Sequence, residues 1–282
     1  MNENNLLIRF DYAMKRILQF YSDFSILEGL VSTVLEEQIH IINIFRNADR
    51  LQEKYDNDNR IDILAKTSQN KLVLIELQNL NGYAYYERTI FGASKFITGC
   101  VDNNEEFPYI HKIYSINIVY FPLGTSTDFI YHGKTEFRGL HRNELLELTP
   151  FRQQEFKVAE TSRLYPEYYI LKVFDFKKQS DIPLEQWAYY LSTGQIPENA
   201  IAPGLQEARE LLRLDYFDKK EMNAYFHHLD DLVILEDNIS TGRLEGYAEA
   251  IKETALKLKK MGLSVEQIMT ATGLSQARVE QL

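Results

Sequence analysis

The chain has 282 residues, of which 45% are hydrophobic and 12% aromatic, and its formal net charge is −10. This composition excludes a disordered protein and predicts one α/β domain with a smaller appendage, while the acidic balance argues against nonspecific coating of DNA, because Lys and Arg make most phosphate contacts. A single cysteine excludes an internal disulfide, and the lack of a leader pattern or a membrane-length apolar run predicts a cytoplasmic protein without membrane contact.

Two helices are expected before the first strands. Apolar residues at helical spacing run through residues 5–21, and a second helix follows Ser22 and Asp23. Glu28 lies at or beside the apolar face of this second helix. It is either a carboxylate at the rim that reaches solvent or one that points inward toward a functional site.

The next segments predict a β-hairpin. Residues 60–66 and 71–78 are rich in Ile, Val and Leu at strand length, and a short polar stretch joins them. If the turn centres on Gln69, then Asp62 lies directly opposite Glu76, because both are equally far from the turn. Such cross-strand pairs hold their Cβ atoms roughly 4.5 to 5.5 Å apart.

One face of this hairpin is polar. Side chains two positions apart on a strand point the same way, so Gln78 shares a face with Glu76. The apolar residues that bury the other face are Val73, Ile75 and Leu77. Two carboxylates at this separation do not both ionise comfortably without a cation between them, and hard divalent ions prefer oxygen ligands. The hairpin therefore predicts a site for Mg²⁺ or another divalent cation.

A helix is expected from about Tyr83 to Val101. The residues along one side of it are Tyr85, Arg88, Gly92 and Lys95. Beside the carboxylates, Arg88 and Lys95 are expected to contact DNA phosphates, Arg88 by preference because its guanidinium group can bind two phosphate oxygens. A solvated helical face would explain both residues without DNA.

The remainder of the chain predicts further strands and then helices. The strands are expected at 111–121, 128–132, 136–140 and 164–174, which gives an α/β sheet with mixed strand directions. The helices are expected at 183–191, 203–214 and 218–236. Trp187 and Tyr190 recur at helical spacing within an amphipathic pattern, so we expect them in the core.

The tail predicts a charged helix over 242–261 and then two short helices around Gly273, an arrangement similar to the core of a helix-turn-helix. The last helix offers only Arg278 and two glutamines, which are few side chains for sequence-specific contacts with bases. Contact with a partner, or packing in a homo-oligomer, is the expected role of the tail.

Several of these segments together resemble a known family. They are Phe24 to Gly29, the hairpin with Glu76 to Asn79, Tyr85 to Arg88 with Gly92 and Lys95, Tyr165 to Tyr169, and Trp187. In this order they resemble the recombination-promoting nuclease (Rpn) or putative transposase family of the PD-(D/E)XK nuclease superfamily. The resemblance implies a restriction-endonuclease-like mixed sheet flanked by helices. We expect this nuclease core over 1–180, a helical extension packed on it over 181–238, and a C-terminal helix with its tail over 239–282.

The resemblance also implies a metal-dependent DNA endonuclease associated with mobile elements or recombination. Asp62, Glu76 and the backbone carbonyl of Leu77 would hold Mg²⁺. Gln78 would orient the attacking water, and Glu28 would act as an outer acid or base. Gln78 stands where the superfamily has Lys, although Gln is usual in the narrower family, and an amide orients water only by hydrogen bonds. A slow or silent nuclease fold that binds DNA or protein, and a merely structural polar patch, are the alternatives.

Overall fold

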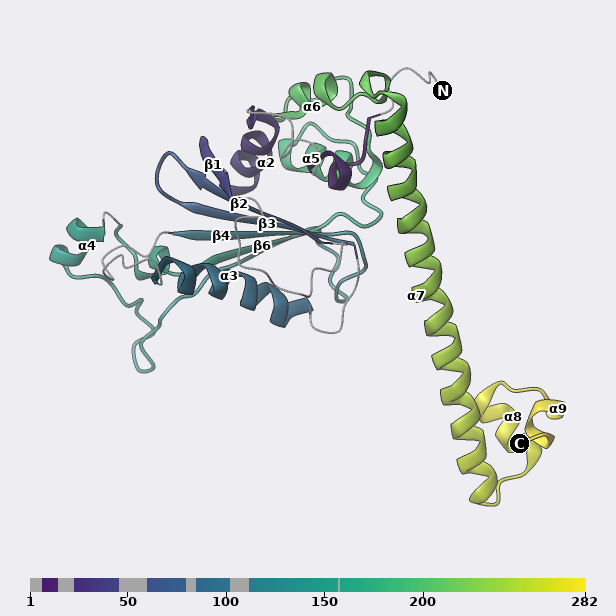
Figure 1. Cartoon of the computed structure of the whole chain (residues 1–282). Coiled ribbons are helices and arrows are strands. Elements are labelled where there is room, and N and C mark those ends of the chain that lie inside the picture. The colour runs from purple at the N-terminus through teal and green to yellow at the C-terminus, as the bar shows by residue number, and fades with distance from the viewer. Residues whose placement is uncertain (1–6, 15–22, 46–59, 80–84, 102–111, 157) are drawn as a thin grey trace. The chain divides into compact units, whose positions relative to one another are not determined.

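The computed structural model of the chain describes residues 7–14, 23–45, 60–79, 85–101, 112–156 and 158–282 (Figure 1). Within these ranges, the side chains at 45, 60–62, 95–101 and 215 lie outside the description. The chain divides into two compact units, Met1–Phe217 and Asp218–Leu282. Among the described helices, none combines the length and the apolar character needed to cross a bilayer.

The first unit is built on one mixed sheet of six strands in the order β1-β2-β3-β4-β6-β5. The strands are β1 (Ile41–Phe45), β2 (Arg60–Thr67), β3 (Leu72–Gln78), β4 (Ile113–Val119), β5 (Ile130–Gly133) and β6 (Glu167–Lys172). β3, β4 and β6 run parallel to one another, and the remaining pairs are antiparallel. This sheet confirms the predicted α/β fold with mixed strand directions.

The β2–β3 hairpin has the predicted register. Asp62 pairs with Glu76, and Arg60 pairs with Gln78. Every residue of β3 is buried, because strands flank it on both sides and helices cover both faces. The helices α2 (Ser25–Leu35) and α3 (Tyr85–Val101) lie on opposite faces of the sheet (Figure 1). The polar face of the hairpin is therefore covered as well as the apolar one.

A group of helices packs beside α2 in the same unit. They are α5 (Pro183–Thr193) and α6 (Leu205–Leu211), with a 3₁₀ turn at Leu214–Tyr216. As predicted, Trp187 and Tyr190 are fully buried, and both rings meet Phe10 edge to face at about 6 Å. The Trp187 Nε1 group donates a hydrogen bond to the Pro203 carbonyl. This packing fixes the helices against the N-terminal segment and α2.

Four segments differ from the sequence-based expectation. β1 and the helix α4 (Pro150–Phe156) were not predicted. Residues 136–140 form no strand; Arg138 makes only an isolated bridge to Leu145, because the segment folds back on itself through the hydrogen bond from Gly139 N to the Glu144 carbonyl. Within the helix expected over 5–21, Leu7 bridges Arg213, residues 10–14 are helical, and residues 15–22 lie outside the described residues.

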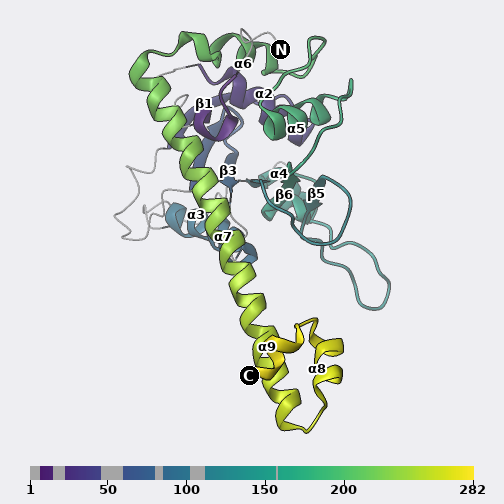
Figure 2. The ribbon, with the colours of Figure 1, turned by 90° about the vertical axis from the view of Figure 1, so that its right-hand side faces the viewer.

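The second unit contains one long helix and two short ones. α7 runs from Lys219 to Lys260, followed by α8 (Val265–Thr272) and α9 (Gln276–Glu280). The expected domain boundary after residue 238 falls inside α7, because a single Gly242 lowers helix stability by only about 1 kcal/mol. Figure 2 shows α8 and α9 beside the C-terminal part of α7, where Ala255, Ile268 and Val279 form a small core. Gly273 makes the predicted turn in the left-handed region.

Gly29 provides a test of the packing between α2 and the chain before α6. A Cβ at this position would lie 2.2 Å from the Pro203 carbonyl oxygen, so the backbone would have to move. We expect Gly29→Ala to lower the free energy of unfolding by about 1 to 3 kcal/mol, as overpacking usually does.

Gly133→Ala is the control in the same unit, because a Cβ there would meet its nearest neighbour, Tyr168, at an ordinary 3.8 Å. Its free energy of unfolding should stay within about 0.5 kcal/mol of the wild type. Equal urea midpoints for the two variants would contradict the close approach at Gly29.

Candidate active site

The candidate site centres on the carboxylate of Glu76, near the C-terminal end of β3. Only 1% of this residue is exposed. Its side chain points toward α3, where a Cβ at Gly92 would lie 3.0 Å from Glu76 Oε1 and 3.5 Å from Leu74 Cδ2. Glycine at position 92 therefore leaves room for the carboxylate beneath the helix. A charge buried this deeply is costly unless it is paired or binds a metal ion.

Gln78 lies two residues further along β3 on the same face and is 3% exposed. Its Nε2 group has no hydrogen-bond partner among the described residues. Its backbone carbonyl accepts a 3.0 Å hydrogen bond from Tyr120 N, which holds the strand end in place. Buried donors without a partner are rare in folded proteins, so this amide marks a position where water or a ligand would bind.

Asp62 occupies the position on β2 directly opposite Glu76. Cross-strand partners of this kind hold their Cβ atoms about 4.5 to 5.5 Å apart. The side chain of Asp62 lies outside the described residues, and among the side chains that are described no group of three potential metal ligands occurs. The Leu77 backbone, between Glu76 and Gln78, belongs to a strand paired on both sides.

Two basic residues of α3 lie in line with Gly92. Arg88 is partly exposed and precedes Gly92 by about one helical turn, so both occupy the same side of α3. Lys95 follows Gly92 by about one turn, and its side chain lies outside the described residues. The helix that covers Glu76 thus carries a cationic group along the same side.

A polar network beside Glu76 was not predicted. Asn117 on β4 pairs with Glu76, its Nδ2 donates to Ser115 Oγ at 3.0 Å, and its Oδ1 accepts from Thr89 Oγ1 at 3.3 Å. Burial raises the pKa of the Tyr85 hydroxyl, and the Glu76 charge raises it further. The signal in the sequence was the alternation of Ser115 and Asn117 within an otherwise apolar strand.

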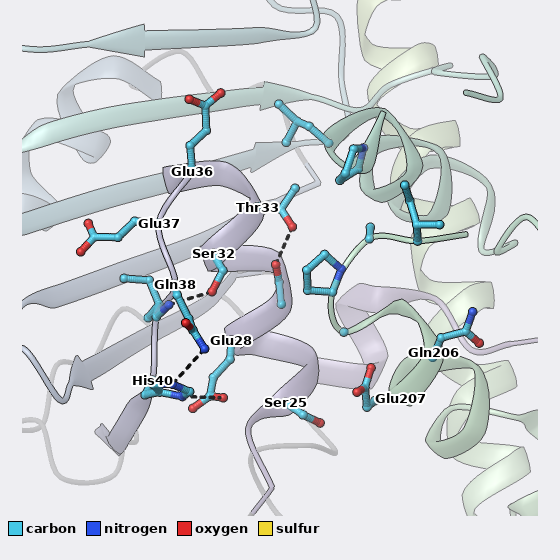
Figure 3. Close-up of a pocket in the computed structure, with 18 of the residues that line it drawn as sticks. Ser25, Glu28, Ser32, Thr33, Glu36, Glu37, Gln38, His40, Gln206 and Glu207 are labelled. Carbon is cyan, nitrogen blue, oxygen red and sulfur yellow. Dashed lines mark hydrogen bonds and ion pairs between the residues drawn. The ribbon is translucent and has the colours of Figure 1, made fainter. Parts of the chain in front are cut away.

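The structure does not bring Glu28 to this pair. Its Oε1 accepts a 2.7 Å hydrogen bond from Ile41 N, and its Oε2 lies 3.7 Å from His40 Nδ1 (Figure 3). Ile41 pairs with Thr67, and residue 67 lies about 16 Å along β2 from residue 62 at 3.3 Å per residue. Glu28 therefore fixes the start of β1 at the turn end of the hairpin.

Around Glu28 lies a groove of about 880 Å³, lined by α2, the loop that follows it and the beginnings of α5 and α6 (Figure 3). The Glu28 side chain is 26% exposed, as expected for a carboxylate at the rim. The sequence pattern left the two orientations open, because it does not specify where the loop after α2 joins the sheet.

A second buried carboxylate, Glu167 at the start of β6, is a useful contrast. It lies 2.7 Å from Lys112 Nζ and 2.8 Å from His132 Nε2. Burial alone would raise the pKa of Glu167, but Lys112 and His132 outweigh this effect and hold the pKa below its usual value. The charge of Glu167 is thus compensated by the Lys112 ammonium group and by the hydrogen bond with His132.

Comparison with known protein families gives a match over most of the chain. A family model described as PD-(D/E)XK nuclease family transposase matches residues 8–236. Neither the curated proteins nor the solved structures contain a match. The matched range includes the hairpin, α3 and the helices that pack beside α2.

Glu28 can be tested by its hydrogen bond to Ile41 N. Glu28→Ala removes the acceptor, and we expect the free energy of unfolding to fall by about 1 to 2 kcal/mol. This is the lower end of the range for a hydrogen bond to a charged acceptor, because the Glu28 carboxylate is partly exposed. Glu28→Gln retains an acceptor oxygen and should lose about 0.5 kcal/mol or less. Urea denaturation of both variants checks the difference, and equal losses would mean that the charge matters more than the hydrogen bond.

Proposed function

The chain belongs to the PD-(D/E)XK nuclease transposase family, and we propose that it is a metal-dependent DNA endonuclease that acts at mobile elements. The observation that carries the proposal is the buried Glu76 carboxylate, which lies beneath Gly92 and opposite the position of Asp62. Family membership supports a nuclease in general. The metal dependence and the endonuclease activity are inferred from the chemistry of the site.

A divalent cation fits the donors at this position. Asp62 and Glu76 would hold it, with the backbone carbonyl of Leu77 as a further ligand, since Mg²⁺ takes oxygen ligands. The charge of such an ion would offset the cost of burying the carboxylate. When bound, a divalent cation lowers the pKa of a water molecule and neutralises charge on the phosphate.

The remaining residues would bind and orient the reactants. Gln78 would orient the attacking water through its amide, whose Nε2 group has no partner among the described residues. Arg88, and Lys95 two turns further along α3, would contact DNA phosphates. Glu28 has no place in this arrangement, because its carboxylate binds the start of β1.

A slow or silent nuclease fold that binds DNA or protein is the second candidate. The observation in its favour is the burial of Glu76 and Gln78, which are 1% and 3% exposed. A phosphate group can reach them only if the cover around the strand end opens. Measured cleavage separates the two candidates.

The central test compares two buried glutamates of one sheet. Glu76→Gln should abolish Mg²⁺-dependent nicking of supercoiled plasmid, because it replaces a charged carboxylate ligand with a neutral amide. Glu167→Gln should lower the free energy of unfolding by about 3 kcal/mol, since it leaves Lys112 without its charged partner, but the folded fraction should still nick.

Plasmid nicking with Mg²⁺ and with chelator, together with thermal unfolding, measures both quantities. Glu28→Gln is a further control that should cut at the wild-type rate. Equal nicking by wild type and Glu76→Gln at matched purity would contradict the assignment of the site, and loss of nicking in folded Glu28→Gln would return Glu28 to it.

Gly92 gives a prediction that depends on space alone. In Gly92→Ala the new Cβ would press on Glu76 Oε1 at 3.0 Å and displace the carboxylate by a few tenths of an ångström. We expect the nicking rate to fall about tenfold or more, because small displacements of catalytic groups are costly. Stability should change little, because the preference of a helix for Ala over Gly, about 1 kcal/mol, offsets the cost of this close contact.

Gly242→Ala in α7 is the matched control, because nothing lies within 4 Å of a Cβ there. Its nicking rate should equal that of the wild type. Wild-type nicking by Gly92→Ala would show that the position of Glu76 is not critical.

A further inference from the structure

The long helix α7 carries an apolar stripe that the nuclease proposal does not use. Its members are the apolar residues Leu229, Leu232, Val233, Ile239, Leu244, Tyr247 and Ile251. At 3.6 residues per turn they fall on one side of the helix. Three of them, Val233, Leu244 and Tyr247, are 66%, 68% and 69% exposed. Aligned and exposed apolar side chains of this kind mark an interaction surface.

The middle of α7 has little to stabilise it within one copy of the chain. Every residue from 241 to 250 is exposed, and Gly242 and Gly246 both weaken a helix relative to Ala. Most helices in proteins depend on packing of an apolar face for their stability. The helix therefore needs a partner along this stretch.

The C-terminal end of the stripe is limited by the packing of other helices of the same unit. There α8 and α9 pack on α7, and Ala255 and Leu258 belong to their common core. From Leu229 to Ile251 the stripe extends for about 34 Å, or about three heptads, which suits a short coiled coil. We refer to residues 229–251 as the α7 stripe.

Two opposite charges lie within the stripe and determine the orientation of a partner. Glu236 and Arg243 are exposed, lie seven residues apart and therefore face the same side of the helix. Neither forms an ion pair among the described residues. In a parallel pair, Glu236 of one copy would face Glu236 of the other, and Arg243 would face Arg243. Like charges would then lie together in an apolar contact. In an antiparallel pair centred near Ser240, Glu236 of each copy lies beside Arg243 of the other.

We propose that the chain forms an antiparallel homodimer through the α7 stripe, with two reciprocal ion pairs between Glu236 and Arg243. A second copy is the occupant because the stripe complements itself in both apolar pattern and charge, as a two-fold interface requires. The dimer joins two copies of the nuclease unit. The sequence predicts that a homo-oligomer would form through the tail. In this proposal the contact lies mainly on α7, before the short helices α8 and α9.

The experiment measures the mass of the full chain by light scattering over a concentration series. The wild type should be a dimer, while Glu236→Arg and Arg243→Glu should each weaken dimerisation about tenfold or more by placing like charges together. The double variant Glu236→Arg with Arg243→Glu should restore the dimer, because the pairs are then reversed and not lost. Glu245→Arg, the same change on the opposite side of α7, is the control and should stay dimeric.

Circular dichroism checks that each variant keeps its helix content, and restoration in the double variant shows that both changes are compatible with the fold. A wild-type monomer at micromolar concentration would overturn the proposal. Equal dimerisation of the wild type, both single variants and the double variant would also overturn it. None of these measurements depends on DNA cleavage, so the result is independent of the proposed nuclease activity.

Discussion

The arrangement of the nuclease unit depends on one constraint, the burial of the Glu76 carboxylate in the centre of a six-stranded sheet. Strands flank β3 on both sides, and α3 covers the face to which the side chain points. A charge in such a place needs compensation. Gly92 leaves room for the carboxylate beneath α3, and Asp62 provides a second carboxylate position opposite it, the pairing from which we infer a bound cation.

The two buried glutamates of the sheet show two ways of meeting this constraint. Glu167 pairs with Lys112 and forms a hydrogen bond with His132, so side chains of the protein itself compensate its charge. Glu76 instead lies opposite Asp62 and beside the amide of Asn117.

The hairpin was predictable because its register depends on local features alone: two apolar strands, a short polar turn and equal distances from Gln69. The buried Trp187 followed from helical periodicity in the same way. The position of Glu28 could not be predicted, because a helix pattern shows which side a residue faces but not which strand it meets. The continuity of α7 was missed for a related reason, since Gly242 weakens a helix without ending it. The polar network at Asn117 depends on the parallel pairing of β3 with β4, which no local pattern specifies.

The central claim is that Asp62 and Glu76 together hold a divalent cation. Calorimetric titration of the metal-free protein with Mn²⁺, in the absence of DNA, tests it directly and does not depend on turnover. The account predicts one site per chain in the wild type and a loss of affinity of about 100-fold in Asp62→Asn, because a charged carboxylate ligand becomes a neutral amide. Absence of binding by the wild type, or equal affinity in the wild type and Asp62→Asn, would contradict it.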